Sequence, residues 1–549
     1  MTLSLRALCG LLTLFVALLA HAAEDHRGGK LRLLATSGAG TLDPQVNYTL
    51  QFAQLFVSIY DGLLTFKKAA GEASYTVVPD LAEALPIQSD GGRTYTFILR
   101  QGVRFSNGQE VTVDDVAASF QRLFKVLSPT SGTFYNLIVG ADLCLKAPAT
   151  CTLSKGLVID RGRRSISFHL VKPDAEFLYK MAFGHAVIVP AASPVHDAGV
   201  QPLTGTGPYM IVSYDPKKQM RLVRNPAFRV WNAEAQPEGY VDEIDYDFGL
   251  PDEEQTSAIA NGQADWMLDP VPVDRLGELG TRYPNQVKIS PLAALYYLAM
   301  NNRIPPFDQP KAREAVNLAI DRSIAVRLFG GSKLAVPTCQ IIPSGIGGHE
   351  DYCPWTKNPG SHWVAPDLDR AKQLVKESGT AGQKVTLIAP GSAIGRTMSS
   401  YARDVLASIG YDAQVRVLAE SLQLTYVQNT SNNVQISYDE WYQDFPVASD
   451  FVDILFSCSS FHPNTDASIN ISGVCDPELD ALMARAKDAS LTSISAANAI
   501  WARVDKKIVD GAYVAPLFNP KHLDFVSKRL GNFVFSAETY FVPALAWVQ

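Results

Sequence analysis

The 549-residue sequence contains no long run of residues with charge of one sign. Its 48 basic and 55 acidic residues leave a formal net charge of −7, so it lacks the basic surface that a nucleic-acid-binding protein needs. Charged residues make up 19% and hydrophobic residues 47% of the chain, which excludes a mainly disordered protein. Short-period repeats and low-complexity tracts are missing as well. We therefore expect three or four folded units and no DNA or RNA partner.

Apolar runs are scarce too, because beyond the N-terminus no segment is long enough to span a membrane. Arg6 precedes an apolar run over residues 8–20, and Ala20-His21-Ala22 then places small residues at both positions that a signal peptidase reads. A membrane anchor needs about 20 apolar residues, and this run is shorter. We therefore expect a signal peptide over residues 1–22 that is cleaved after Ala22.

Cysteines are few, with seven in the chain. Cys9 lies at the start of the apolar run without a small residue before it, which argues against a lipid anchor. The other six are Cys144, Cys151, Cys339, Cys353, Cys458 and Cys475. An even set in an exported protein indicates disulfides, and the sequence neighbours 144/151, 339/353 and 458/475 form the simplest of about 15 connectivities. Each bridge would stabilise its loop by about 2–4 kcal/mol. Buried free thiols are the alternative if the signal peptide is misread.

Signatures of common catalytic sites are missing. The nine histidines never form His-Glu-x-x-His, and the Gly-Ser segment at 391–395 has the wrong spacing for a hydrolase nucleophile. Residues 205–209 and 28–30 contain glycines but complete no phosphate-binding loop. The carboxylate pairs Asp114-Asp115 and Glu253-Glu254 are typical of helix starts. We therefore expect no enzyme, no cofactor and no metal site, with a secreted peptide hydrolase as the weaker alternative.

Strand and helix patterns alternate along the chain. Residues 94–99 and 164–170 alternate at period two, which predicts strands. Thr112 is placed to cap a helix whose first turn is acidic. Pro366 is placed to open another helix and Gly379 to end it. The chain is therefore expected to be a mixed α/β protein.

A change of pattern marks a domain crossing. Residues 251–269 are acidic and polar, whereas residues 292–300 are apolar enough for a buried strand, after which Pro305-Pro306 breaks the pattern. The helical stretch over 309–329 begins a second large unit that continues to about residue 518. A cleft between two such units is where a small ligand usually binds.

Several short segments occur in an order that covers nearly the whole mature chain. They are Tyr60-Asp61-Gly62-Leu63-Leu64, Val103-Arg104-Phe105-Ser106-Asn107-Gly108, Val111-Thr112-Val113-Asp114-Asp115-Val116, Gly205-Thr206-Gly207-Pro208-Tyr209, Met300-Asn301-Asn302, Pro306-Phe307-Asp308, Ala315-Val316-Asn317-Leu318-Ala319-Ile320-Asp321 and Trp441-Tyr442-Gln443-Asp444-Phe445-Pro446. In this order and behind an export signal, the sequence resembles extracellular solute-binding protein family 5, the dipeptide- and oligopeptide-binding receptors of ABC importers.

The resemblance implies a class II periplasmic-binding-protein fold, α/β in class, whose two lobes close around a ligand. It also implies an extra subdomain inserted in the first lobe. We expect lobe I over residues 23–60, 196–293 and 519–549, the inserted subdomain over 61–195, and lobe II over 294–518.

The implied function is a receptor that captures di- or oligopeptides in the interlobe cleft and delivers them to the permease subunits of an ABC importer. We expect a monomer in the periplasm, because a receptor without a lipid anchor needs an outer membrane to stay near its importer. The alternative is a receptor of the same fold for a non-peptide solute, such as a metal chelate, haem, an opine or a sugar. For a metal chelate, one of His349, His362 or His462 would be a ligand, although each is typical of a surface histidine.

The resemblance assigns the ligand's α-ammonium group to Asp444, because peptide-binding members place an aspartate three residues after a tryptophan, here Trp441. A desolvated ammonium group needs a charged partner. Without the resemblance, Asp444 would be interpreted as capping the turn before Pro446. Trp441 and Tyr442 are candidate walls of side-chain pockets, with ordinary core packing as the alternative.

Three further contacts follow from the resemblance. Tyr297 matches an aromatic position near the hinge, Tyr48 lies in a first-lobe segment that reaches the ligand, and Arg396 loosely matches a basic residue that holds a peptide carboxylate. A solvated arginine at a helix start is the alternative for Arg396. The sequence departs from the family after Asp444, where residues 445–450 replace a Pro-Asp-Pro-like run, so the ligand class stays open within the family.

Overall fold

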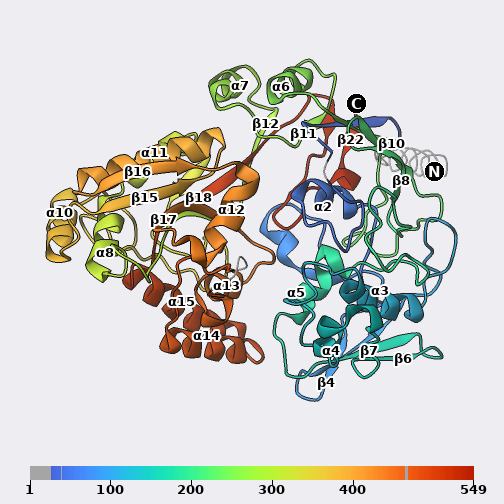
Figure 1. Ribbon diagram of the computed structural model, residues 1–549. Coiled ribbons are helices and arrows are strands. Elements are labelled where there is room, and N and C mark those ends of the chain that lie inside the picture. The colour runs from blue at the N-terminus through green and yellow to red at the C-terminus, as the bar shows by residue number, and fades with distance from the viewer. Residues whose placement is uncertain (1–25, 39, 464–467) are drawn as a thin grey trace, which may run out of the picture.

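The computed structural model of the protein describes residues 26–38, 40–463 and 468–549, and its helices and strands form two bodies joined near the top of the view (Figure 1). The prediction of a mixed α/β chain is confirmed. Within the described ranges, no helix combines the length and the apolar character needed to cross a bilayer. The predicted signal peptide over residues 1–22 lies outside the described residues.

The first lobe is built on a five-stranded sheet in the order β11-β1-β10-β9-β8, in which β1 is parallel to its two neighbours. The strands are β1 (Lys30–Ala35), β8 (Tyr209–Asp215), β9 (Gln219–Arg224), β10 (Glu243–Phe248) and β11 (Trp266–Met267). Helix α2 (Leu50–Phe56) covers one face through Phe52 and Leu55, which pack on Leu31 and Leu33. Helices α6 (Asp252–Ala260) and α7 (Leu276–Arg282) cover the other face. Four short strands near the C-terminus complete this lobe: β19 (Leu530–Gly531) pairs with β22 (Trp547–Val548), and between them β20 (Phe535–Ser536) forms a hairpin with β21 (Tyr540–Phe541).

A four-stranded antiparallel sheet, β4-β5-β7-β6, forms the inserted subdomain. Strands β5 (Thr94–Ile98) and β7 (Ser165–His169) confirm the two predicted strands, and Thr112 caps helix α3 (Val113–Lys125) as predicted, with a reciprocal bond to Asp115. The remaining elements of this part are β2 (Leu64–Phe66), β3 (Val77–Pro79), β4 (Ile87–Ser89), β6 (Leu157–Asp160), α4 (Ala141–Lys146) and α5 (Phe177–Ala182). Helix α3 and this sheet share one apolar cluster, so the subdomain has its own core.

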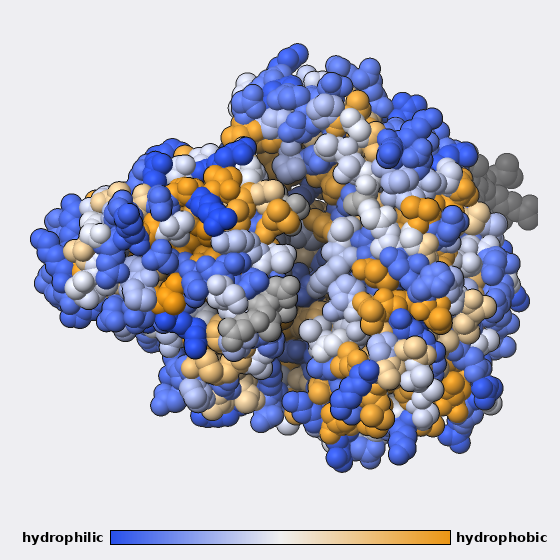
Figure 2. All heavy atoms as spheres, viewed as in Figure 1, coloured by the Kyte–Doolittle hydropathy of each residue, from blue (hydrophilic) through white to orange (hydrophobic). Residues whose placement is uncertain are grey.

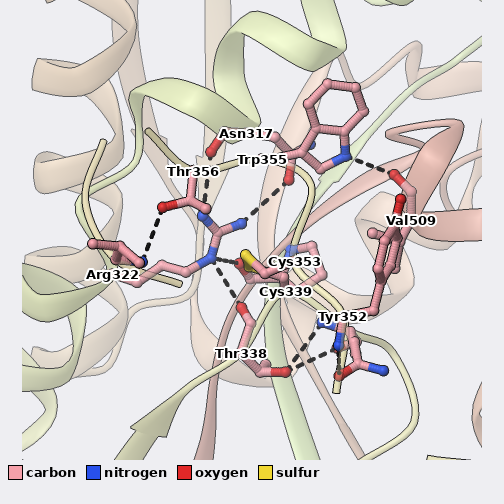
Figure 3. The surroundings of a disulfide bond; sticks show 12 residues. Asn317, Arg322, Thr338, Cys339, Tyr352, Cys353, Trp355, Thr356 and Val509 are labelled. Carbon is pink, nitrogen blue, oxygen red and sulfur yellow. Dashed lines mark hydrogen bonds between the residues drawn. A yellow bond between two sulfur atoms is a disulfide. The ribbon is translucent and has the colours of Figure 1, made fainter. Parts of the chain in front are cut away.

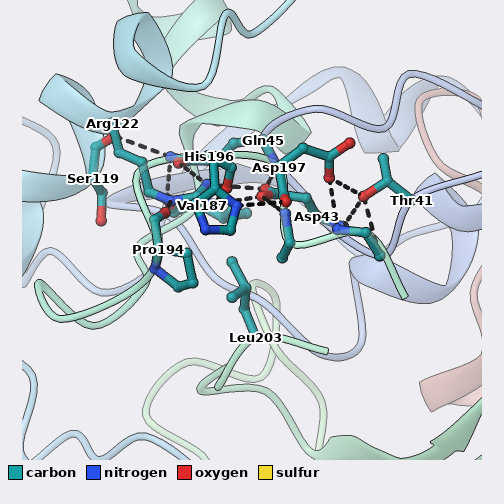
Figure 4. A network of polar contacts seen from close by, with 12 residues as sticks. Thr41, Asp43, Gln45, Ser119, Arg122, Val187, Pro194, His196, Asp197 and Leu203 are labelled. Atoms are coloured by element: carbon teal, nitrogen blue, oxygen red, sulfur yellow. Dashed lines mark hydrogen bonds and ion pairs between the residues drawn. The ribbon is translucent and has the colours of Figure 1, made fainter. Parts of the chain in front are cut away.

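A buried ion pair joins the inserted subdomain to the first lobe (Figure 4). Arg122, on helix α3, places both terminal nitrogens on the carboxylate of Asp43, and its Nη1 lies 2.9 Å from Asp43 Oδ1. The side chains are 4% and 0% exposed. Gln45 and the carbonyl of Pro194 accept further bonds from the same guanidinium group, so its donors are satisfied without water.

The second lobe contains a sheet in the order β12-β18-β13-β17-β15-β16, with β14 paired to β18. Its strands are β12 (Val287–Pro291), β13 (Ala294–Met300), β14 (Ala335–Pro337), β15 (Lys384–Ala389), β16 (Asp412–Val417), β17 (Ile436–Tyr442) and β18 (Val514–Phe525). Its helices are α8 (Pro310–Ala319), α9 (Arg322–Phe329), α10 (Leu368–Glu377), α11 (Ala393–Ser408), α12 (Glu420–Gln428), α13 (Ser449–Phe456), α14 (Pro477–Ser490) and α15 (Ile494–Asp510). Every residue of β13 is buried, as the apolar run predicts.

Two helix predictions in this lobe need correction. The helical stretch at 309–329 is two helices, because Asp321 leaves the helical conformation and its side chain caps α9 by accepting from the backbone of Ser323 and Ile324. The helix expected to open at Pro366 begins at Leu368, because Asp367 is its N-cap. Its predicted end at Gly379 is confirmed by the positive φ of 71° there.

Strand β18 passes from one lobe to the other. Its first half pairs with β13 in the core of the second lobe, and its second half, residues 521–525, pairs with β12. The short link between β12 and β13 makes the second connection. The lobes are thus joined at one edge, which leaves a groove between them on the facing sides (Figure 2).

The structure pairs Cys144 with Cys151, Cys339 with Cys353 and Cys458 with Cys475, the three neighbours that the sequence spacing favours. Figure 3 shows that the Cys339–Cys353 bridge lies beside the fully buried Arg322. The Nε of Arg322 donates to the carbonyls of Thr338 and Pro516, at 2.9 and 2.8 Å. This disulfide loop is therefore tied to β18, the strand that connects the lobes.

Asp43→Asn keeps the volume of the buried side chain and removes its charge. We expect the free energy of unfolding to fall by about 3–5 kcal/mol, because Arg122 then stays buried without a countercharge. Equilibrium urea unfolding measures the change. Asp114→Asn is the matched control, because its pair with Arg161 is exposed and we expect no measurable change. Equal stability of Asp43→Asn and the wild type would contradict this account.

Candidate ligand-binding site

Asp444 lies in the groove between the lobes, two residues after the end of β17. Tyr48, from the loop before α2 in the first lobe, donates its hydroxyl proton to Asp444 Oδ1. The ring of Tyr48 is held by contacts with Phe183 and His185, at centroid distances of 5.8 and 5.1 Å. Two of the residues predicted from the sequence are therefore brought together from opposite lobes.

Burial governs the charge of this carboxylate. It raises the pKa of Asp444 to about 6, and the hydrogen bond from Tyr48 acts in the opposite direction. The same loss of water, followed by the negative charge of Asp444, raises the pKa of Tyr48. The neighbouring His185 is also buried, which lowers its pKa to about 4, so this histidine is neutral at physiological pH. Asp444 is thus ionised at neutral pH without a basic side chain bonded to it in the described part of the chain.

A second carboxylate supports the first. The backbone N–H of Asp444 donates to Oδ2 of Asp450 at 2.8 Å, and Asp450 is 1% exposed in the first turn of α13. Burial, and then the charge of Asp444, raise the pKa of Asp450 well above its usual range. The bond fixes the loop between β17 and α13 and so the direction of Asp444.

The residues that flank Asp444 anchor this loop in the opposite lobe. Phe445 is 3% exposed and belongs to the apolar cluster of the inserted subdomain, with ring centroids 5.4 Å from Phe134 and 6.2 Å from Tyr179. The hydroxyl of Ser449 donates to Glu176 on the loop before α5. Because these contacts cross the groove, the structure represents a closed arrangement of the lobes.

Gln443 makes a further contact across the groove. Its Nε2 donates to Glu538 Oε1 at 2.6 Å and to the carbonyl of Ala537 at 3.1 Å, both in the turn of the β20–β21 hairpin. Glu538, Asp450 and Glu176 were not predicted from the sequence. Their signal is weak. Glu538 and Glu176 belong to the opposite lobe and reach this loop only on closure, whereas Asp450 approaches Asp444 through the local fold of the loop between β17 and α13.

Trp441 and Tyr442 lie on opposite faces of the second-lobe sheet. Trp441 packs against the cluster formed by α13, α14 and α15, and its buried Nε1 has no hydrogen-bond partner among the described residues. Tyr442 is 37% exposed, and its hydroxyl lies 2.7 Å from that of Tyr296. Tyr442 therefore retains surface for a ligand, and Trp441 combines core packing with an available donor.

Tyr297 is buried within the second lobe. It is 3% exposed in β13 and packs with Leu295 and Ala299 against the helices of the second lobe. Strand β13 is central in the sheet and both of its faces are covered, and the ligand contact at Tyr297 stays a prediction.

Arg396 lines a separate hollow of 530 Å³ at the start of α11. The hollow is formed by Gly391, Ser392, Arg396, Val417, Leu418 and Ala419. Strand β15 is parallel to β16 and β17, so the hollow lies at the same edge of the sheet as Asp444. The guanidinium group of Arg396 is exposed, has no partner among the described residues and is available to an anion.

The histidines considered as metal ligands lie elsewhere. His349 and His362 lie 3.4 and 3.7 Å from the carboxylate of Asp351 in a loop of the second lobe. In the described ranges, no group of three or more His, Cys, Asp or Glu side chains is arranged to hold a metal ion.

Comparison with known proteins identifies the architecture. Residues 76–463 match the family described as "Bacterial extracellular solute-binding proteins, family 5 Middle". The chain belongs to this family. The sequence-based recognition of family 5 is therefore confirmed, and the family consists of solute-binding receptors, not enzymes.

Two curated relatives of this family 5 protein cover most of both chains. "Probable di/tripeptide-binding protein 5" of Pseudomonas aeruginosa is 26% identical over 460 residues, which is 81% of this chain and 82% of the relative. "Glutathione-binding protein GsiB" of Salmonella typhi is 27% identical over 467 residues, 83% and 82% of the two chains.

Solved structures share the two-lobed class II fold. "Clavulanic acid biosynthesis oligopeptide binding protein 2" superposes with a TM-score of 0.84 at 23% identity, and covers 95% of this chain and 96% of its own. DppA from Helicobacter pylori in complex with the peptide STSA has a TM-score of 0.77 at 21% identity, with 96% and 99% coverage. The predicted fold class is confirmed.

Phe445→Ala removes the ring that the second lobe buries in the inserted subdomain. Burial of a phenylalanine side chain is worth about 1.5–3 kcal/mol, so we expect the unliganded variant to shift toward open lobes. Small-angle X-ray scattering would show a larger radius of gyration than in the wild type. Leu143→Ala, at a 66% exposed position of the same subdomain, is the control. An unchanged radius for Phe445→Ala would contradict the role of this contact.

Proposed function

We propose that this family 5 protein is a receptor that binds di- or oligopeptides between its lobes and delivers them to the permease subunits of an ABC importer. The observation that carries the proposal is Asp444, a partly buried carboxylate in the groove whose side chain bonds to Tyr48 and to no cation in the described residues. A peptide α-ammonium group supplies that cation, and the closed lobes strengthen the pair by excluding water.

The opposite end of a peptide has a partner at Arg396. The guanidinium group and the first turn of α11 both favour a carboxylate, and the hollow shares a sheet edge with Asp444. Tyr442 and Trp441 are then placed to contact the peptide between its ends. Backbone contacts and paired ends give affinity without selecting one side chain, which suits a receptor for many peptides.

The comparisons support this ligand class. One relative is named a di/tripeptide-binding protein, another binds glutathione, and one structural neighbour contains the peptide STSA. By analogy with the periplasmic binding protein DppA we place this protein in the periplasm, and from its sequence we propose a monomer that is cleaved after Ala22. We also propose that residues 61–195 form the inserted subdomain and residues 294–518 the second lobe.

Asp444→Ala is the direct test of the ligand anchor. We expect it to weaken a free-amino dipeptide such as Ala-Ala by at least about thirtyfold, because loss of one partner of a buried charge pair costs about 2 kcal/mol or more. N-acetylated Ala-Ala lacks the ammonium charge and should bind weakly to wild type and variant alike. Isothermal titration calorimetry measures both. Asp369→Ala, on the exposed face of α10, is the matched control. Equal losses for the two peptides would remove Asp444 from the site.

Peptide affinity should also depend on pH through Asp444. Its pKa of about 6 in the free protein means that the carboxyl is neutral at pH 5 and ionised at pH 7. The ammonium group favours the ionised form, so binding of Ala-Ala should weaken about tenfold between pH 7 and pH 5. Calorimetry at the two pH values tests this, and Asp444→Asn should show a flat profile. A flat profile in the wild type would contradict the assignment.

A further inference from the structure

Three carboxylates that meet at the groove have no cationic partner in the described part of the chain. They belong to Asp444, Asp450 and Glu538. The nearby Lys180 is held by other acids, with its Nζ 2.8 Å from Asp174 Oδ2 and 3.3 Å from Glu176 Oε2. The region therefore holds three carboxyl groups, more than one α-ammonium group can pair with.

Asp450 gives an independent indication of a ligand group. Its side chain is almost fully buried, and its Oδ2 accepts the backbone N–H of Asp444. Its Oδ1 is also buried and has no hydrogen-bond partner among the described residues. Buried carboxylate oxygens are normally bonded. Because Asp450 Oδ2 is bonded to the backbone of Asp444, the unpartnered Oδ1 lies close to Asp444, the proposed anchor for the ligand's ammonium group.

Glu538 is fixed beside the anchor by its hairpin. The N–H of the preceding residue, Ala537, donates to Ser74 Oγ at 2.9 Å, which sets Tyr75 next to Glu538. Oε1 of Glu538 accepts from Gln443 at 2.6 Å. Glu538 is therefore connected to Asp444 through one glutamine side chain and one peptide unit. Its Oε2 makes no bond to another described residue.

Three tyrosine side chains lie near enough to feel the charge of the Glu538 carboxylate. After burial, the charge of Glu538 is the main cause that raises the pKa of Tyr75 and of Tyr179, so both rings lie within its field. Tyr540, two residues farther along the hairpin, also responds to Glu538, after burial and Tyr442. Tyr75, Tyr179, Tyr540 and Tyr442 each keep part of their surface exposed. A carboxylate with tyrosine rings near it suits a desolvated cation, which can form an ion pair and cation–π contacts.

We propose that Glu538, with Tyr75 and Tyr540, forms a second cation subsite that selects peptides whose first residue has a basic side chain. This proposal rests on the proposed peptide-binding function. The α-ammonium group pairs with Asp444, and the lysine or arginine side chain of the same residue extends past Gln443 to Glu538. The two cationic groups of the ligand then pair with two of the three carboxyl groups that meet in this region.

The test compares two dipeptides that differ in one charge. Lys-Ala and norleucine-Ala have first side chains of similar length and shape, and only lysine carries an ammonium group. We expect the wild type to bind Lys-Ala about tenfold more tightly in calorimetry at pH 7.5, the effect of one charge-assisted contact. Glu538→Gln should reduce this ratio to nearly one and leave the affinity for norleucine-Ala unchanged.

Further variants separate the effect of the Glu538 charge from that of the Tyr75 ring and from loss of folding. Glu254→Gln, on exposed α6 of the same lobe, is the charge control and should keep the wild-type ratio. Tyr75→Phe retains the ring and should also keep the ratio, whereas Tyr75→Leu should lower the affinity for Lys-Ala alone. Normal binding of norleucine-Ala shows in each case that the variant is folded.

The outcomes distinguish the two proposals. If both dipeptides bind the wild type with equal affinity, or if Glu538→Gln weakens both to the same extent, the cation subsite is wrong and the peptide receptor stands. If a preference for Lys-Ala survives in Glu538→Gln, the assignment to Glu538 is overturned. If neither these dipeptides nor Ala-Ala binds, the peptide-receptor function fails, and the subsite fails with it.

Discussion

Strand β18 is the constraint on which the relative position of the two lobes depends. One stretch of backbone belongs to the second-lobe sheet over its first half and pairs with β12 over its second half. Pro516 and Pro520 lie within it and donate no backbone hydrogen bond, so the ladder is interrupted where the strand changes partners. Movement of the lobes is therefore confined to rotation about this edge, and every contact across the groove has to form on the opposite side.

The local parts of this fold follow from short sequence signals, and the exceptions have local causes as well. Thr112 and its acidic first turn predict helix α3 because a capping bond needs only residues three positions apart. Periodicity alone merges α8 and α9, because apolar spacing continues across Asp321 while the backbone there adopts a capping geometry. The disulfide pairing is also predictable from local sequence, because each bridge joins cysteines that are close in the chain.

The groove is less accessible to sequence reasoning. Asp444 is found through its spacing from Trp441, and Tyr48 through its segment, but nothing in either segment indicates that they bond to each other. Tyr297 is buried in a wholly apolar strand, and such a strand carries no sign of which layer each aromatic residue faces. Glu538 lies 94 positions after Asp444 in the sequence, by the difference of their numbers, and reaches it only through Gln443. Such proximity is created by lobe closure and leaves no periodic signal.

Closure balances two opposing contributions that meet in one loop. Burial of Phe445 in the inserted subdomain favours closed lobes, since its ring leaves water. The adjacent carboxylates oppose closure, because it withdraws Asp444 and Asp450 from water. A neutral ligand that fills the groove leaves the unfavourable burial of the carboxylates in place. A cationic ligand offsets this unfavourable burial by pairing with a carboxylate, so the closed state is stabilised by the ligand's charge as well as by its fit. Under the proposed function, the acidic loop thus favours lobe closure around a ligand that carries a cation.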